Sequence, residues 1–210
     1  MGKFTLVIFL CFLVNINLVA QDINSVFPNL PRDIIYGLTP DMKQSLLDDP
    51  NDSTKFVATA IYEKIERKAL SDNFISLKTS EVGSTDIKLL PLINNSKIIC
   101  LVQTVCGTIC DSKISFYTDK WEPIDSAELF PKRDINWFIK PDAEKGDEKH
   151  THAISALTMF PMQYIFSATD DTISVVFDPK SFMTNEDYNN IEPFLTKEPK
   201  VLTWDKVRFK

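Results

Sequence analysis

The amino-acid sequence predicts an α+β fold in which N-terminal helices pack on an antiparallel meander sheet. Apolar residues recur about every 3.6 positions in the part of the chain that follows residue 20. From Asn73 onward the apolar period changes to about two residues, and short turn signals separate the alternating stretches. Helices followed by hairpin-connected strands are typical of the α+β class.

Residues 1–20 are predicted to be a cleavable secretory signal. Lys3 precedes an apolar run over 4–14, and the stretch ends on a small residue, so cleavage is expected between Ala20 and Gln21. The run is shorter than the roughly 20 residues that span a bilayer, and no second run of that kind follows. Cys11 lacks the small preceding residue that lipidation requires. We therefore expect an exported protein, periplasmic or secreted, with no membrane span after cleavage.

The mature chain, residues 21–210, is predicted to form a single domain. The full chain has 23 Lys and Arg against 29 Asp and Glu, and one of these lysines lies in the signal, so the net charge changes from -6 to about -7 on cleavage. This acidic balance argues against nucleic acid as a partner, because phosphate binding requires clustered Lys and Arg. Only 5 glycines against 15 Phe, 5 Tyr and 3 Trp indicate a packed, β-rich protein.

Three helices are expected at the start of the mature chain. Apolar residues from Ile23 to Leu30 fall at helical spacing, and Thr39 is placed to cap a second helix with Pro40 at its first position. After a turn at 49–52, the apolar residues of 56–70 also lie near one helical face, although β-branched residues weaken that pattern.

Four strands follow as an antiparallel meander. Their apolar residues alternate with polar ones, and the connections fall at Gly83, Asn94-Asn95 and Gly107. The expected strands cover 74–79, 87–92, 97–105 and 113–117.

A charged loop over 141–152 separates this meander from a second alternating region. That region contains strands over 159–167 and 172–177, a short helix over 184–191, and closing strands over 201–209. Because both regions contain hairpins of similar length, the sequence raises the hypothesis of two related halves, 21–124 and 125–210. No residue-level repeat accompanies it.

The residues of the meander resemble an uncharacterised family of secreted Bacteroidales proteins that is known as a domain of unknown function. The resemblance is densest from Phe74 to Trp121 and extends to the segment 192–199. It implies a secreted or cell-envelope protein and supplies no catalytic residues. The segments that carry it include 72–77, 87–92, 98–102, 104–107 and 111–117.

Cysteine offers the first candidate chemistry. Cys106 and Cys110 flank a three-residue turn between two expected strands, so their Cα atoms could approach the roughly 5.5 Å of a disulfide. An oxidising compartment would favour that bond, which would stabilise the fold by about 2 kcal/mol or less because the loop it closes is short. Cys100 lies inside an apolar strand and is expected to be a buried thiol. Free thiols at 106 and 110, or a redox or metal role, are the alternatives.

The second candidate is a metal site at His150 and His152, the only two histidines. In an extended chain alternate residues share one side, and imidazole with carboxylate is a common ligand set for divalent metals. The alternative is a solvated, mixed-charge loop, which would have to be ordered before it could hold an ion. The carboxylates that could complete the site belong to Asp142, Glu144, Asp147 and Glu148.

Other residues argue against an enzyme. The carboxylate pairs Asp48-Asp49 and Asp170-Asp171 fall in turns, where acids are common, and adjacent side chains do not face one substrate. No nucleophile elbow or phosphate-binding glycine loop is present in the sequence. Trp121, Trp137 and Trp204 could stack on sugars or anchor a partner if exposed, or could pack in the core.

The resemblance also suggests a modification. Secreted proteins of the Bacteroidales type can carry O-glycans where Asp precedes Ser or Thr and then an apolar residue or Thr. Three sites fit this pattern, and the turn-like settings of the first and third favour their modification. They are Ser53, Ser126 and Thr172.

Taken together, these features predict a noncatalytic binding or interaction module of the bacterial envelope that needs no cofactor. Its partner is expected to be an envelope protein or a glycan. Two alternatives stay open. One is a small metal-dependent hydrolase that uses the loop from Asp142 to His152, and the other is a structural envelope component.

Overall fold

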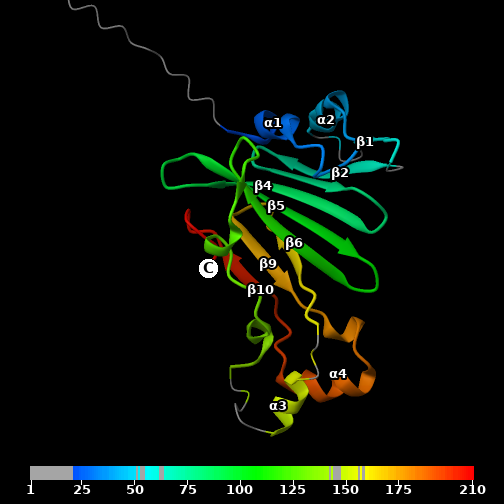
Figure 1. The fold of residues 1–210 in the computed structure, drawn as a ribbon, viewed down its shortest axis with the longest axis vertical. Helices are drawn as coiled ribbons and strands as arrows, with labels where there is room; N and C mark the ends of the chain where they lie inside the picture. Colours follow the sequence, from blue (N-terminus) through cyan, green and yellow to red (C-terminus); the bar gives the residue numbers. More distant parts are fainter. Residues whose placement is uncertain are drawn as a thin grey trace, which may run out of the picture.

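The structure, a computed structural model, contains two antiparallel sheets and a few short helices, which makes the fold α+β (Figure 1). It describes residues 21–50, 52, 55–61, 64–141, 143, 148–155, 157 and 159–210. The predicted signal and its last residue, Ala20, lie outside these residues, whereas Gln21 lies within them. Among the described residues, no helix has the length and apolar character needed to cross a membrane.

The larger sheet has seven strands in chain order, from β1 to β7. Each strand pairs with the next in the sequence, so the predicted meander is present, with a bulge between Arg67 and Ala69. The strands are β1 (Phe56–Val57), β2 (Ile65–Ser71), β3 (Phe74–Lys78), β4 (Gly83–Pro91), β5 (Lys97–Cys106), β6 (Cys110–Tyr117) and β7 (Pro123–Ile124).

The smaller sheet has three strands in the order β10-β9-β8. It lies beside the lower edge of β6, and helices gather beyond it at the far end of the molecule (Figure 1). Its strands are β8 (Gln163–Phe166), β9 (Thr172–Val176) and β10 (Lys200–Thr203). The α-helices are α1 (Ile23–Val26), α2 (Pro40–Leu47), α3 (Glu148–Ser155) and α4 (Asn185–Ile191). The 3-10 helices are η1 (Phe27–Asn29), η2 (Ser126–Glu128), η3 (Ile135–Phe138), η4 (Pro179–Ser181) and η5 (Glu192–Phe194).

The larger sheet is buried on both faces because its central strands carry apolar residues at successive positions. In β5, Ile99 and Leu101 belong to one core cluster, and Cys100 and Val102 belong to another. Residues of α1 and α2 complete the first cluster, and residues of the small sheet complete the second. A strand covered on both sides reads as a continuous apolar run, which the segment Ile98 to Val102 does.

Two local predictions are wrong, and each has a physical reason. The segment 56–70, predicted as a helix, forms β1 and β2, because Ile65 and Arg67 are buried on alternate positions while the β-branched residues favour an extended chain. The charged segment predicted as a loop contains α3, whose residues 148–155 are helical. By contrast, α2 begins as predicted, with the Thr39 hydroxyl accepting a hydrogen bond from the Met42 N–H.

The predicted division of the chain at 124/125 falls at the end of β7, the last strand of the large sheet. The large sheet has seven strands and the small sheet has three, and the two differ in strand order. That the halves are related stays a prediction.

Three buried cations fasten the loops to the sheets by donating to backbone carbonyls. The guanidinium of Arg67, which is 1% exposed, donates to the carbonyl oxygens of Leu46 at 2.8 Å and Asp48 at 2.9 Å. It also donates to those of Asp49 at 2.6 Å and Asp52 at 2.5 Å. One side chain of β2 therefore holds the carboxyl end of α2 and the turn that follows it, where carbonyl dipoles favour a cation.

Lys43 and Lys88 act in the same way. The Lys43 ammonium donates to the carbonyls of Pro28 and Leu30, and Lys88 in β4 reaches the carbonyls of Ser167 at 2.8 Å and Asp170 at 2.6 Å. Burial lowers the pKa of both amines, and for Lys88 the nearby acids Asp171 and Asp170 partly oppose that effect. Lys88 thus joins the large sheet to the turn between β8 and β9.

Replacing Arg67 by methionine tests this arrangement. Arg67→Met keeps much of the side-chain volume but leaves the four carbonyl oxygens without their donor, so we expect the free energy of unfolding to fall by about 3 kcal/mol. Urea denaturation of residues 21–210 measures it. The matched control is Lys68→Met, at a side chain that is 49% exposed and paired with Glu66 on the surface, where we expect a change below about 0.5 kcal/mol. Equal losses in the two variants would contradict the assigned role.

Candidate functional site

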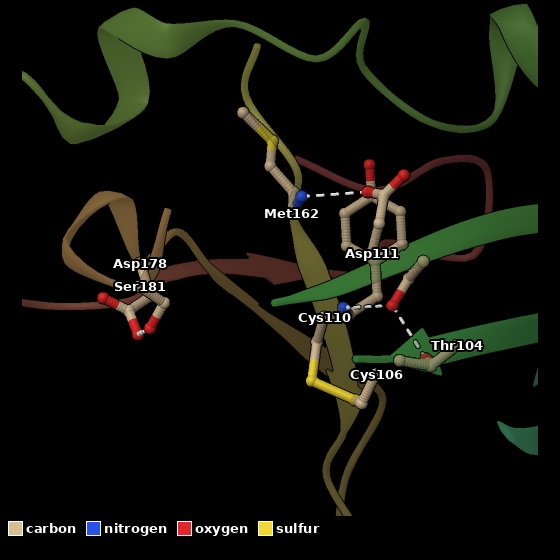
Figure 2. The surroundings of a disulfide bond; sticks show 9 residues. Thr104, Cys106, Cys110, Asp111, Met162, Asp178 and Ser181 are labelled. Atoms are coloured by element: carbon tan, nitrogen blue, oxygen red, sulfur yellow. Dashed lines mark hydrogen bonds between the residues drawn. A yellow bond between two sulfur atoms is a disulfide. The ribbon is translucent and has the colours of Figure 1, made fainter. Parts of the chain in front are cut away.

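The two sheets meet at Ser112 in β6. Its backbone N–H donates to the Met162 carbonyl at 3.0 Å, and its hydroxyl oxygen accepts from the Tyr164 N–H at 3.0 Å. The same hydroxyl lies 2.8 Å from the Thr104 hydroxyl. The Asp111 carboxylate accepts from the Met162 N–H at 3.0 Å (Figure 2). Ser112 and Thr104 are both buried, so these bonds replace the ladder that a continuous sheet would have.

Arg133 closes this junction from the outside. Its guanidinium donates to the Tyr164 hydroxyl at 2.8 Å, to the Asp111 carboxylate at 2.9 Å and to the Ser112 carbonyl. It also lies over the Tyr164 ring, 5.2 Å from the centroid. Burial raises the pKa of Tyr164, an effect that the nearby Arg133 partly offsets. Through these hydrogen bonds, Arg133 holds the segment that follows β7 against β6 and β8.

The segment that carries Arg133 borders a groove beside the junction, and the cavity volume of this groove is about 410 Å³. Its floor is apolar, formed by Ile114, Phe130 and Pro131 with the Tyr164 ring beneath. Lys113 and Lys132 stand at its rim beside Arg133. We call this feature the cationic groove.

The lysines of the cationic groove are exposed, and among the described residues neither forms an ion pair. A second hollow of about 230 Å³ adjoins the groove across Phe130 and Pro131 and is lined by Arg208 and Lys210 together with Glu128. Lys210 pairs with Asp205, whose pKa is lowered by that contact. In a chain with a net charge of -6, this gathering of cations is local, and it suits an anionic ligand.

The predicted disulfide is present. Cys106 and Cys110 are bonded across the three-residue turn between β5 and β6, with their Cα atoms 4.0 Å apart (Figure 2). Asp178 and Ser181 lie near the bond and line a small hollow of about 160 Å³ with Cys110. Cys100 is a free, buried thiol, as expected, and burial raises its pKa well above the usual value, so it is not a nucleophile at neutral pH.

The predicted metal ligands are not gathered by the described part of the chain. Asp142, Glu144 and Asp147 lie outside the described residues, and so does the side chain of His150. The backbone of 148–155 is helical rather than extended, and positions two apart on a helix do not share a side, which removes the geometric argument for 150 and 152. Among the described residues, no three His, Cys, Asp or Glu side chains are placed to hold one metal ion.

The paired carboxylates have structural settings. The Asp170 carboxylate accepts hydrogen bonds from the Thr172 N–H and hydroxyl, and these and the Ser167 hydroxyl lower its pKa. The backbone carbonyls of Asp48 and Asp49 bind Arg67. Both pairs therefore form turns, as the sequence indicated.

Two of the three tryptophans are unsuited to binding. Trp121 is 7% exposed and donates to the Val26 carbonyl, and Trp204 is 5% exposed and donates to the Pro91 carbonyl. Trp137 is partly buried against the second core cluster. Of the alternatives left open by the sequence, core packing is therefore the correct one for Trp121 and Trp204.

Of the candidate O-glycosylation sites, Ser53 lies outside the described residues. Ser126 is the first residue of η2 and lines the cationic groove, and Thr172 is the first residue of β9. Both are partly exposed, and the hydroxyl of Thr172 donates to Asp170. Their modification stays a prediction.

The sequence did not identify the groove residues, although one signal was present. Lys132 and Arg133 are adjacent cations in an acidic chain, and they follow a proline. What places them beside Lys113 and Ile114 is the return of the chain after β7 across the edge of β6, which involves contacts between residues about 20 positions apart. No local pattern reports such a contact.

The fold and site define a class: an α+β protein built on a seven-stranded meander, with a cationic groove where a second sheet joins it. The chain belongs to the family described as "Protein of unknown function (DUF3256)", whose model matches residues 15–209. A solved domain of an uncharacterized protein from Porphyromonas gingivalis W83 is similar to this chain with a TM-score of 0.79 and 25% identity, covering 91% of this chain and 98% of that one. No curated protein matches this chain.

One carboxylate with a buried oxygen lies apart from the groove. Asp86 in β4 is partly buried, and its buried Oδ1 has no hydrogen-bond partner among the described residues. Desolvation raises the pKa of Asp86, and a hydrogen bond from Ser76 opposes this effect in part. A raised pKa means that the folded state holds this proton more tightly than the unfolded chain does. Folding is therefore weakened as the pH rises from the ordinary value of 3.8 through the raised pKa.

Asp86→Asn should remove this pH dependence. The amide keeps an acceptor for Ser76 and carries no charge to desolvate. We therefore expect the free energy of unfolding of the variant to rise relative to that of the wild type between pH 4 and pH 7, by about 1 kcal/mol at pH 7. Chemical denaturation at several pH values measures the gain, with Asp33→Asn at an exposed position as the matched control. A difference between variant and wild type that stays constant with pH would show that Asp86 is not the cause.

Proposed function

We propose that the protein is an exported, noncatalytic binding module whose ligand site is the cationic groove. The observation that carries this proposal is the pair of exposed lysines, Lys113 and Lys132, which stand without ion-pair partners among the described residues over an apolar floor in an acidic chain. An apolar surface with a few oriented charges is the usual composition of a binding site. The partner would be an envelope protein or a glycan that carries negative charge.

The titratable groups support a binding role rather than catalysis. The Tyr164 hydroxyl at the groove accepts from Arg133 and has a raised pKa, so it is not a base at neutral pH. The nearby Asp111 carboxylate accepts from Arg133 and from the Met162 N–H through one oxygen, Oδ1. Both groups therefore make structural contacts at the junction of the two sheets.

Export is supported by the disulfide and by the setting of Gln21. Disulfides persist in oxidising compartments and are rare in the bacterial cytoplasm. The Gln21 side chain donates to the Asp119 carboxylate at 2.7 Å and accepts from the Lys97 N–H at 2.6 Å. A mature chain that begins at Gln21 would thus have its first side chain fastened to the large sheet.

The export proposal predicts the mass of the chain made by its native cell. We expect a mass that corresponds to residues 21–210 with one disulfide, measured by intact mass spectrometry with and without reduction and alkylation. Excess mass that maps to Ser53, Ser126 or Thr172 would establish the predicted glycan, and no excess would exclude it. Recovery of the chain with residues 1–20 still attached would contradict cleavage at Ala20.

The groove itself is tested by titrating ¹⁵N-labelled residues 21–210 with poly-glutamate and with alginate at low salt. We expect amide shifts at Lys113, Ile114 and Lys132 that weaken as salt is added, because exposed charges are screened. The variant Lys113→Glu/Lys132→Glu should lose these shifts. A variant of equal net charge, Lys120→Glu/Lys180→Glu, changes exposed lysines away from the groove and should keep them.

Shifts from neither polyanion, or shifts that persist in the groove variant, would overturn the groove as the ligand site. The same labelled sample is also titrated with a divalent metal. Shifts of residues 148–155 on addition of the metal, while both polyanions fail, would instead favour the metal-dependent alternative.

A further inference from the structure

We infer that the cationic groove takes an extended, acidic segment of a partner protein, which adds as a short strand to the edge of β6 at Ile114. This inference rests on the proposed binding function and names the ligand of that site. It depends on three features: an open stretch of sheet edge, the two lysines beside it, and the burial of the aromatic rings beneath.

The outer edge of β6 is occupied on both sides of Ile114. In an antiparallel strand, alternate residues direct their N–H and C=O to the same side. The Ser112 N–H points outward and donates to the Met162 carbonyl, so the backbone groups of residues 114 and 116 point outward too. Phe116 is paired with Ile124 of β7, and Ser112 is covered by the segment leading into β8.

Ile114 lies between these two occupied positions, and its own outward-facing backbone groups are unpaired in the part of the chain that the structure describes. Within the described residues, nothing accepts from its N–H or donates to its C=O on that edge. It is partly exposed, and it lines the cationic groove. An extended peptide placed along this edge can accept from the Ile114 N–H and donate to its carbonyl, which is the geometry of strand addition.

The charges beside the gap select an acidic peptide. Lys113 and Lys132 both line the groove, and neither is neutralised by an ion pair among the described residues. Acidic side chains at alternate positions of an added strand would lie on one face and could reach both ammonium groups. Ile114 and Pro131 offer apolar contact between them.

The aromatic residues favour a peptide over a polysaccharide. Sugar rings bind proteins largely by stacking on exposed aromatic faces, and the rings under the groove are not exposed, since Phe130 is 7% and Tyr164 is 2% accessible. The unpaired N–H and C=O of Ile114 lie beside two lysines. A polypeptide matches them, because it supplies its own C=O and N–H.

Four probes distinguish these ligands in titrations of ¹⁵N-labelled residues 21–210. The first is a capped peptide of alternating Glu and Val, the second is the same peptide with Gln for Glu, the third carries N-methyl groups on the amides of one edge, and the fourth is alginate. We expect the Glu peptide to shift the Ile114 amide and to bind about tenfold more tightly than the other three. Because the peptide rather than the protein is changed, folding of the protein is the same in each arm.

Protein variants give a second readout. Lys132→Glu should weaken the Glu peptide about tenfold, and Lys120→Glu, at an exposed position outside the groove, should leave its affinity unchanged. Equal binding of the N-methylated peptide, or alginate binding as tightly as the peptide, would overturn strand addition while the groove stays an anion site. If no probe shifts the amide signals of the groove residues, both the inference and the proposed function are wrong. The lysines would then serve only to protect a sheet edge from pairing.

Discussion

The hydroxyl of Ser112 is the contact on which the arrangement of the two sheets depends. No regular backbone ladder joins β6 to β8 in the described residues, and the Ser112 carbonyl accepts from Arg133. The Ser112 hydroxyl accepts from the Tyr164 N–H in place of that carbonyl and is itself held by Thr104. Once β8 is fixed there, the inner face of the small sheet closes the second core cluster, and the chain that returns from β7 forms the rim of the cationic groove.

The buried cations show how this protein satisfies backbone groups that its short helices leave unpaired. Helix ends and tight turns expose carbonyl oxygens, which lose hydrogen bonds when they are buried. Lys43, Arg67 and Lys88 supply charged donors at three such places. The arrangement costs desolvation of each cation, which is visible as the lowered pKa of both lysines, and it gives each loop a defined position on the sheet.

Local chemistry predicted much of the fold. The alternation of β3 to β6, the Thr39 cap, the turns and the disulfide all follow from residues close together in the sequence. The segment 56–70 was predicted wrongly because Arg67 looks like a surface residue, and its burial in a strand is explained by carbonyls at the end of α2 and in the turn that follows it. The groove was missed for the same reason. Lys113 and Lys132 meet through the packing of one chain segment over another, and spacing in the sequence carries no record of it.

The reach of Lys88 has a consequence for the order in which the molecule assembles. Each hairpin of the large sheet joins neighbouring strands and closes a short loop, whereas the bonds from Lys88 to Ser167 and Asp170 join residues 79 and 82 positions apart. Loop closure becomes slower and more costly in entropy as the separation grows. We therefore expect the meander to form first and the small sheet to dock onto it late. In that order, the apolar face around Cys100 and Val102 would be open to solvent until the small sheet docks, and the chain would be most prone to aggregation at that stage.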